Sequence, residues 1–171
     1  MKKTILEWTK TLLITLVIFF AFRTYVAEAY YIPSGSMIPT LNISDRIIAN
    51  KFIYNFTDID RGDIVVFNPP IESKSPFVKR VIGLPNETIS VENGIVYVDN
   101  KPLEEPYLFA PPINDFSPYK IPDNNYFLMG DNRNNSSDSR FWGTISIDNI
   151  IGKAEFIYYP INDIKMLSFK E

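Results

Sequence analysis

The chain has 171 residues, of which 46% are hydrophobic and 22% are charged, a composition typical of one folded globular domain. It contains no cysteine and no histidine, which excludes disulfides, thiolate chemistry, a Ser-His-Asp triad and a typical zinc site. The net charge is −3, and beyond residue 28 the chain carries 13 basic and 18 acidic residues. Such an acidic body has no electrostatic footprint for nucleic acid. Any catalysis must use Ser, Thr, Lys, Asp, Glu, Tyr or a hard metal ion.

The N-terminal segment predicts a membrane anchor. Residues 11–22 are uncharged and apolar, and basic residues lie near both ends of this stretch, where long side chains can reach the lipid headgroups. The lysines before this stretch favour a cytoplasmic N-terminus, which comprises residues 1–10. We predict a single transmembrane signal anchor over 11–28 and an extracytoplasmic domain over 29–171, on the extracellular side of the cell membrane.

Two alternatives to a retained anchor stay open. Ala27-Glu28-Ala29 has the small-x-small pattern of a cleavage site, so the segment would also fit a cleaved secretory signal peptide. The uncharged stretch is shorter than the ~20 residues of a typical span, and a buried core helix is the other alternative.

Beyond residue 30, short apolar runs alternate with turn residues, and no helical pattern of ordinary length follows the anchor. Asn93-Gly94 between two alternating runs predicts a β-hairpin, because both turn positions favour positive φ. The fold class is therefore mainly β, with antiparallel sheets forming a single body. The predicted strands lie at 46–54, 63–67, 77–84, 88–92, 95–98 and 150–159, the last as one long strand or a pair.

Residues 102–123 contain six prolines. Proline cannot donate to a β-ladder, so this segment is predicted to be a loop or lid insertion outside the sheet interior.

A first chemical motif occupies residues 32–41, Ile-Pro-Ser-Gly-Ser-Met-Ile-Pro-Thr-Leu. Gly35 lets the chain turn tightly between Ser34 and Ser36, and the prolines stiffen both sides. A held, exposed loop of this kind suits a nucleophilic hydroxyl, whereas an ordinary surface loop would account for the same residues.

A second motif places Lys79 and Arg80 inside an apolar run. Successive side chains of a strand point to opposite faces, so we expect one of the two to face inward and the other outward. A buried lysine loses hydration and its pKa falls, which leaves a neutral amine able to accept a proton. A salt-bridged surface strand is the alternative.

A third motif covers residues 130–143, which are rich in short hydrogen-bonding side chains and contain two arginines. This composition suits a rigid polar scaffold held by Asp–Arg pairs. A calcium loop is the alternative, with oxygens from Asp131, Asn135 and Asp138. The Gly and the terminal Glu of a hand-type loop do not fall at the required offsets.

Taken together, these segments resemble type I signal peptidases, the membrane-bound Ser/Lys enzymes that remove signal peptides. The resemblance runs in family order from about residue 5 to residue 160 and is closest to the compact enzymes of Gram-positive bacteria. Asn134 stands where many members have Asp, and Ser137 where Ala is frequent. The matching segments are 34–40, 61–65, 79–85, 130–140 and 152–154.

The resemblance implies roles for several residues. Ser36 would be the nucleophile and Lys79 the neutral general base, which later protonates the leaving amine. The Ser34 hydroxyl and the Ser36 N–H would form the oxyanion hole, and Ser136 would orient the lysine amine. Arg80 is expected to point away from Lys79 and to take no part in catalysis. Structural support is expected from Asp131, Asp138 and Arg140.

The resemblance also implies a substrate and partners. Cleavage would follow small-x-small (Ala-x-Ala) motifs of signal-peptide-bearing preproteins, with the peptide bound as an added strand near Ser36. The other partners would be the lipid bilayer and a nearby secretion translocon, with no cofactor, no metal and no nucleic acid. Tyr30, Tyr31 and Ile32 are predicted to rest in the membrane surface. Phe52, Tyr54 and Phe56 are predicted either there or in the core.

Three rival functions have weaker support. Residues 117–120 match the Ser-x-x-Lys of penicillin-binding proteins, but Pro118 opposes the helix that this motif needs, and its partner motifs are absent. Self-cleaving repressor-type Ser/Lys proteases share a related β fold, but the chain has no DNA-binding segment. An inactive, membrane-tethered binding protein is the non-enzymatic alternative, which cleavage of an Ala-x-Ala preprotein would exclude.

Overall fold

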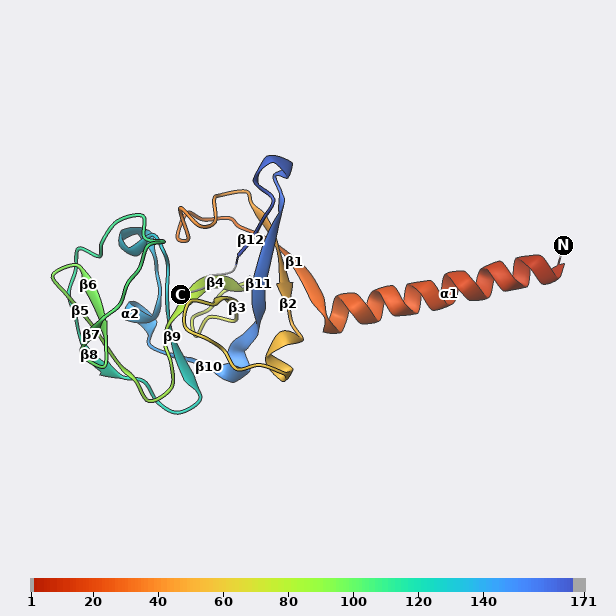
Figure 1. The fold of residues 1–171 in the computed structure, drawn as a ribbon. Helices are drawn as coiled ribbons and strands as arrows, with labels where there is room; N and C mark the ends of the chain where they lie inside the picture. The colour runs from red at the N-terminus through yellow and green to blue at the C-terminus, as the bar shows by residue number, and fades with distance from the viewer. Residues whose placement is uncertain (1, 168–171) are drawn as a thin grey trace.

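The structure is a computed structural model that describes residues 2–167. Helix α1 (Lys2–Tyr25) projects away from the β body (Figure 1). Large apolar side chains between Leu12 and Phe20 are exposed along it. Among the described residues, no helix combines the length and apolar character of a membrane-crossing helix. Strand β1 already begins at Ala27, so the last two residues of the predicted anchor segment belong to the β body.

Two antiparallel sheets contain the strands of the β body. The larger sheet has the order β1-β2-β11-β3-β4-β9-β10, and β12 pairs with β11. This agrees with the predicted mainly β, antiparallel body. Its strands are β1 (Ala27–Tyr31), β2 (Arg46–Asn50), β3 (Ile64–Phe67), β4 (Phe77–Gly83), β9 (Asn125–Met129), β10 (Ile145–Ser146), β11 (Ile150–Tyr159) and β12 (Lys165–Met166).

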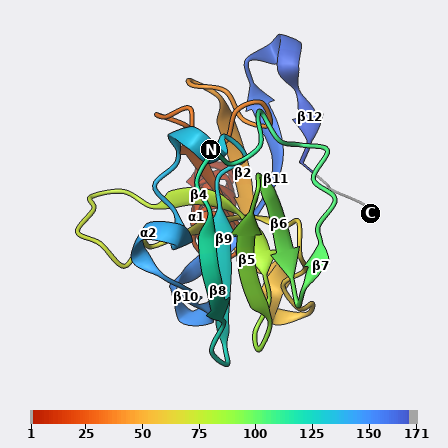
Figure 2. The ribbon, with the colours of Figure 1, turned by 90° about the vertical axis from the view of Figure 1, so that its left-hand side faces the viewer.

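The smaller sheet has the order β7-β6-β5-β8, and its strands lie side by side in Figure 2. The predicted hairpin is confirmed, because Asn93 and Gly94 both have positive φ between β5 and β6. The strands are β5 (Thr88–Glu92), β6 (Ile95–Val98), β7 (Lys101–Pro102) and β8 (Phe116–Lys120). The short helical elements are η1 (Ile53–Asn55), η2 (Arg133–Asn135), α2 (Ser139–Trp142), η3 (Ile147–Asn149) and η4 (Ile161–Asp163).

The predicted strand over 46–54 is too long, because the chain leaves the sheet after Asn50. The Asn50 side-chain oxygen accepts hydrogen bonds from the backbone N–H groups of Phe52 and Ile53 and thereby starts η1. Tyr54 turns inward and donates to Asp63, whereas Phe52 and Phe56 are exposed. These three residues therefore do not form one buried strand face.

The proline-rich segment also differs from the prediction in part. Residues 103–115 contain no strand or helix, but residues 116–120 form β8. Pro118 is tolerated there because β8 is an edge strand, in which one side needs no ladder donor.

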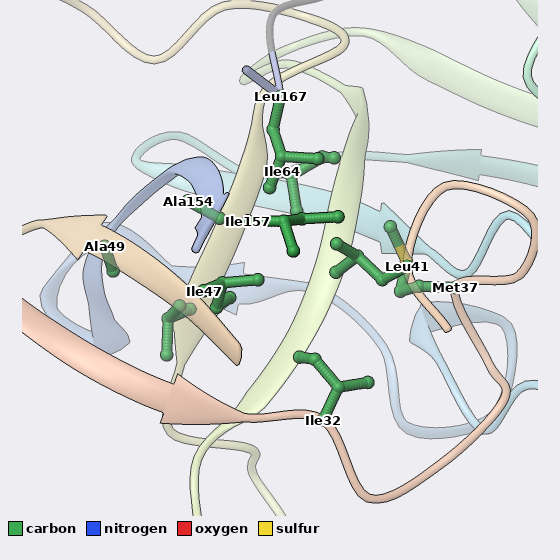
Figure 3. Packing of buried hydrophobic residues seen from close by; sticks show 10 residues of the cluster. Ile32, Met37, Leu41, Ile47, Ala49, Ile64, Ala154, Ile157 and Leu167 are labelled. Carbon is green, nitrogen blue, oxygen red and sulfur yellow. The ribbon is translucent and has the colours of Figure 1, made fainter. Parts of the chain in front are cut away.

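The cluster of buried residues in Figure 3 connects the loop between β1 and β2 to the sheet. Met37 and Leu41 come from this loop and pack with Ile47 and Ile157 from β2 and β11. Full burial of a side chain of this size stabilises the fold by roughly 1.5–3 kcal/mol. The core thus fixes the loop that carries Ser36.

Candidate active site

Ser36 lies on a loop that is held from both sides. Met37, the next residue, is almost fully buried, and the Leu41 N–H donates to the Met37 carbonyl. On the other side, the Asn132 N–H donates to the Ser36 carbonyl oxygen at 3.1 Å. Thr40 donates its hydroxyl hydrogen to Asp131 at 2.5 Å. Core packing and the 130–140 loop together fix the Ser36 backbone.

Lys79 reaches Ser36 from β4. Its Nζ lies 2.8 Å from Ser36 Oγ and 3.1 Å from the Val78 carbonyl oxygen, and its side chain is only 4% exposed. Burial lowers the pKa of Lys79 to about 8, against a smaller opposing effect of Asp138 and Asp131, which favour the ammonium form. Among the described residues, Lys79 has no carboxylate in salt-bridge contact. The amine is therefore uncharged at mildly alkaline pH.

Arg80 departs from the expected alternation of buried and exposed side chains. It is also buried, 2% exposed, so the expectation that one of the two basic residues faces outward is wrong. The opposite face of the sheet is covered as well, because Tyr107 of the proline-rich segment places its ring 3.9 Å from the guanidinium carbon. Arg80 donates two hydrogen bonds to Asp131, at 2.8 and 2.7 Å.

Ser136 lies beside Ser36 without bonding to the lysine. Its Oγ is buried and has no hydrogen-bond partner in the described part of the chain. A Cβ added at Gly130 would clash with Ser136 Oγ and with the Ser36 carbonyl oxygen, which shows how tightly these groups pack. Asp138 lies beneath this contact, where it accepts from the Gly130 N–H at 3.1 Å and caps α2.

Ser34, the third serine of the predicted site, lies close to Ser36. Its Oγ lies 3.5 Å from Ser36 Oγ, and it lines the same cavity. The structure thus gathers Ser34, Ser36 and Lys79 around one cavity and sets Ser136 behind them. Asp131, Asp138 and Arg140 are engaged in hydrogen bonds with their neighbours.

The cavity beside these groups has a volume of about 360 Å³. Tyr30 and Tyr31 line it from β1, although the sequence had suggested the membrane surface for them. Phe77 and Val78 line it from β4. The described strand β9 pairs only with later residues of β4, from Arg80 onward. Asn135, which the sequence analysis considered only as a calcium ligand, also lines the cavity, as does Ser137, to which the sequence analysis assigned no role.

The carboxylates proposed for a calcium loop have other partners. Asp131 is paired with Arg80, and Asp138 accepts two hydrogen bonds from the Arg140 side chain, at 2.8 and 2.9 Å. In the residues that the structure describes, no group of three or more potential ligands could hold a metal ion.

Comparison with known proteins places the chain among the signal peptidases. The family model for signal peptidase, peptidase S26, matches residues 5–159. A probable signal peptidase I-2 of Synechocystis is 44% identical over 172 residues, covering 98% of this chain and 79% of the relative. Signal peptidase I S of Bacillus subtilis is 39% identical over 176 residues, covering 96% of this chain and 94% of the relative.

A crystal structure of signal peptidase I from Enterococcus faecalis has a TM-score of 0.50 and 27% identity, covering 57% of this chain and 97% of that chain. The chain therefore belongs to the S26 family of signal peptidases. Within this family it is a type I signal peptidase, a hydrolase. The higher coverage of the Bacillus relative agrees with the expected compact form.

Proposed function

We propose that this peptidase uses a Ser36/Lys79 dyad to remove N-terminal signal peptides after small-x-small (Ala-x-Ala) sites. The observation that carries the proposal is the 2.8 Å separation of Lys79 Nζ and Ser36 Oγ, together with burial of the lysine. In a chain without histidine, a neutral lysine is the general base available to a serine nucleophile.

The reaction follows from these two groups. Neutral Lys79 takes the Ser36 hydroxyl proton while Oγ attacks the scissile carbonyl carbon, which leaves a tetrahedral oxyanion and a lysine ammonium. The ammonium then protonates the leaving amine as the C–N bond breaks, giving an acyl-enzyme and free mature protein. A water molecule, deprotonated by Lys79, then attacks the ester carbon. The lysine ammonium returns this proton to Ser36 Oγ as the ester C–O bond breaks, which releases the signal peptide and restores the neutral amine.

Three further groups would support these steps. The Ser36 N–H and the Ser34 hydroxyl would donate to the oxyanion, which the short distance between the two serine hydroxyls supports. Ser136 would orient the lysine amine, since its buried hydroxyl has no other partner among the described residues. Asp131, Asp138 and Arg140 would hold the loop behind them.

The substrate would bind in the cavity as an added strand. Phe77 and Val78 line the cavity and lie before the part of β4 that pairs with β9. A peptide placed there would pair with this edge of β4, with its small side chains against the cavity wall.

The exposed apolar side chains of α1 support membrane anchoring. Exposed large hydrophobic residues run from Leu12 to Phe20 and have no contact with the β body that would cover them. We propose that this segment anchors the enzyme in the cell membrane, with the N-terminus cytoplasmic and the catalytic body on the extracellular side near the translocon.

The test is cleavage of a preprotein that carries an Ala-x-Ala site. Ser36→Ala and Lys79→Ala should each lower kcat/KM by at least about 10⁴-fold, because each removes one half of the dyad. The matched controls are Ser117→Ala and Lys120→Ala, which alter the exposed Ser-x-x-Lys of β8 and should leave cleavage unchanged. Undiminished cleavage by either dyad variant would contradict the mechanism.

A further inference from the structure

Three arginine–carboxylate pairs surround the loop that carries Ser136. Their N–O distances are 2.7, 2.8 and 2.5 Å, and all six side chains are at most 10% exposed. The pairs are Arg80–Asp131, Arg140–Asp138 and Arg133–Glu105. Each joins one positive and one negative group, so the set contributes no net charge to the interior.

Two of these pairs lie near the dyad. Arg80 follows Lys79 in β4, and its partner Asp131 follows Gly130, which packs against the Ser36 carbonyl oxygen. Asp138 accepts from the Gly130 N–H, so its carboxylate lies just behind the same contact. Both carboxylates are close enough to favour the ammonium form of Lys79 and to oppose the lowering of its pKa by burial.

Among the described groups near Lys79, Arg133 is a further cation, which pairs with Glu105 and also interacts electrostatically with Asp131. Tyr30 shares the cavity, and its hydroxyl donates to Glu28. Tyr107 is neutral, because burial raises its pKa. In the part of the chain that the structure describes, the groups around Lys79 and its neighbours are Tyr30 and Tyr31 of β1, with Glu28 behind them; Arg80 of β4; Asp131, Arg133, Asp138 and Arg140 after β9; and Glu105 and Tyr107 of the proline-rich segment.

The sign of the electrostatic effect follows from this arrangement. A buried carboxylate without its arginine would stabilise a nearby ammonium and keep the lysine protonated at neutral pH. A protonated lysine cannot accept the hydroxyl proton. The arginines cancel these two negative charges, and burial then dominates.

We propose that Arg140 and Arg80 are positioning residues for the peptidase reaction, which neutralise Asp138 and Asp131 and thereby keep Lys79 in the uncharged form. This role rests on the proposed function of Lys79 as general base. It goes beyond structural support, because the reaction would need the positive charge of each arginine and not only the space that its side chain fills.

The experiment is the pH dependence of kcat/KM for preprotein cleavage by the full chain in detergent micelles. Arg140→Gln leaves Asp138 uncompensated, so the acid limb should move upward by about one pH unit. Asp138→Asn leaves Arg140 uncompensated, so the limb should move downward by a similar amount. The double variant Asp138→Asn/Arg140→Gln should return the limb to the wild-type position.

This pattern separates a charge effect from damage to the fold. Loss of packing would lower kcat/KM in all three variants, but would not move the acid limb in opposite directions or restore it in the double variant. Arg140→Lys keeps the charge and should retain the wild-type limb. Arg61→Gln breaks a partly buried pair with Glu87, which does not act on Lys79, and should leave the limb in place.

The outcomes distinguish this inference from the proposed function. If Lys79→Ala is inactive but Arg140→Gln and Asp138→Asn keep the wild-type limb, the charge-balancing role is wrong and the dyad stands. If Lys79→Ala retains wild-type activity, both are wrong. Should Arg140→Gln fail to fold, a downward shift in Asp138→Asn supports the role, and an unmoved limb overturns it.

Discussion

At the scale of single residues, the site depends on how closely the 130–140 loop approaches Ser36. Gly130 makes this approach possible, because any side chain there would collide with the Ser36 carbonyl oxygen and the Ser136 hydroxyl. Asn132 then bonds to the same carbonyl oxygen. The position of the nucleophile is therefore set from outside its own loop.

Gly130→Ala should lower kcat/KM by about 10²-fold, since a shift of about 1 Å in a reacting group costs that much. Gly152→Ala is the control, because its Cβ would meet the backbone of Asn50 in the β2–β11 pairing, away from the cavity. Thermal unfolding should report a loss of stability in both variants. Equal specific activity of the two folded variants would contradict the account.

Sequence reasoning was most informative about Ser34, Ser36 and Lys79, because each lies in a short ordered motif. It was wrong about the burial of Arg80. Strand alternation predicts one exposed face only when nothing covers that face, and Tyr107 comes from a segment 27 residues further along the chain. Such a long-range contact leaves no local pattern.

At the scale of elements, the proline-rich segment is firmly attached to the catalytic loop. Arg133 donates to both oxygens of Glu105, with side-chain exposures of 0% and 3%. Asn134 accepts from the Ile113 N–H and donates to the Pro111 carbonyl. These contacts support a fixed brace behind the site more than a lid over it.

Glu105→Gln should destabilise the protein by about 3 kcal/mol, because it leaves the buried guanidinium of Arg133 without its countercharge. Urea unfolding followed by fluorescence measures this change. Glu104→Gln alters the exposed neighbour and should stay within about 0.5 kcal/mol of wild type. A similar small effect of Glu105→Gln would mean that the pair is not a structural brace.

The predictability of the elements followed their local signals. The hairpin at Asn93-Gly94 was located correctly because its turn chemistry is specific. Strands β1 and β9 were not predicted, since β1 follows a helix without a turn signal and β9 shows no alternation of polar and apolar residues. Strand β8 was missed because prolines surround it.

At the scale of the whole molecule, α1 and the β body have different surroundings. The body buries its apolar residues in three clusters, whereas α1 exposes large apolar side chains along its middle. Figure 1 shows the helix extending away from the body. This division of the chain supports the proposal that lipid covers the helix.

Full-length protein should therefore float with lipid vesicles in a density gradient, and Leu16→Lys/Val17→Lys should not. Each lysine at the centre of a membrane helix costs about 2.5–3.5 kcal/mol. Phe109→Lys/Ile113→Lys places the same charges on exposed apolar sites of the body and should float like wild type. Flotation of the Leu16→Lys/Val17→Lys variant would contradict anchoring by α1.

The pH–rate profile of the wild-type enzyme tests the Ser36/Lys79 mechanism most directly. The pKa of Lys79 is lowered to about 8, so the protonated, inactive form dominates below that pH and the neutral base above it. On a preprotein substrate, kcat/KM should rise about tenfold per pH unit along the acid limb. It should level off above an apparent pKa of about 8. A flat profile between about pH 6 and 9 would contradict the mechanism.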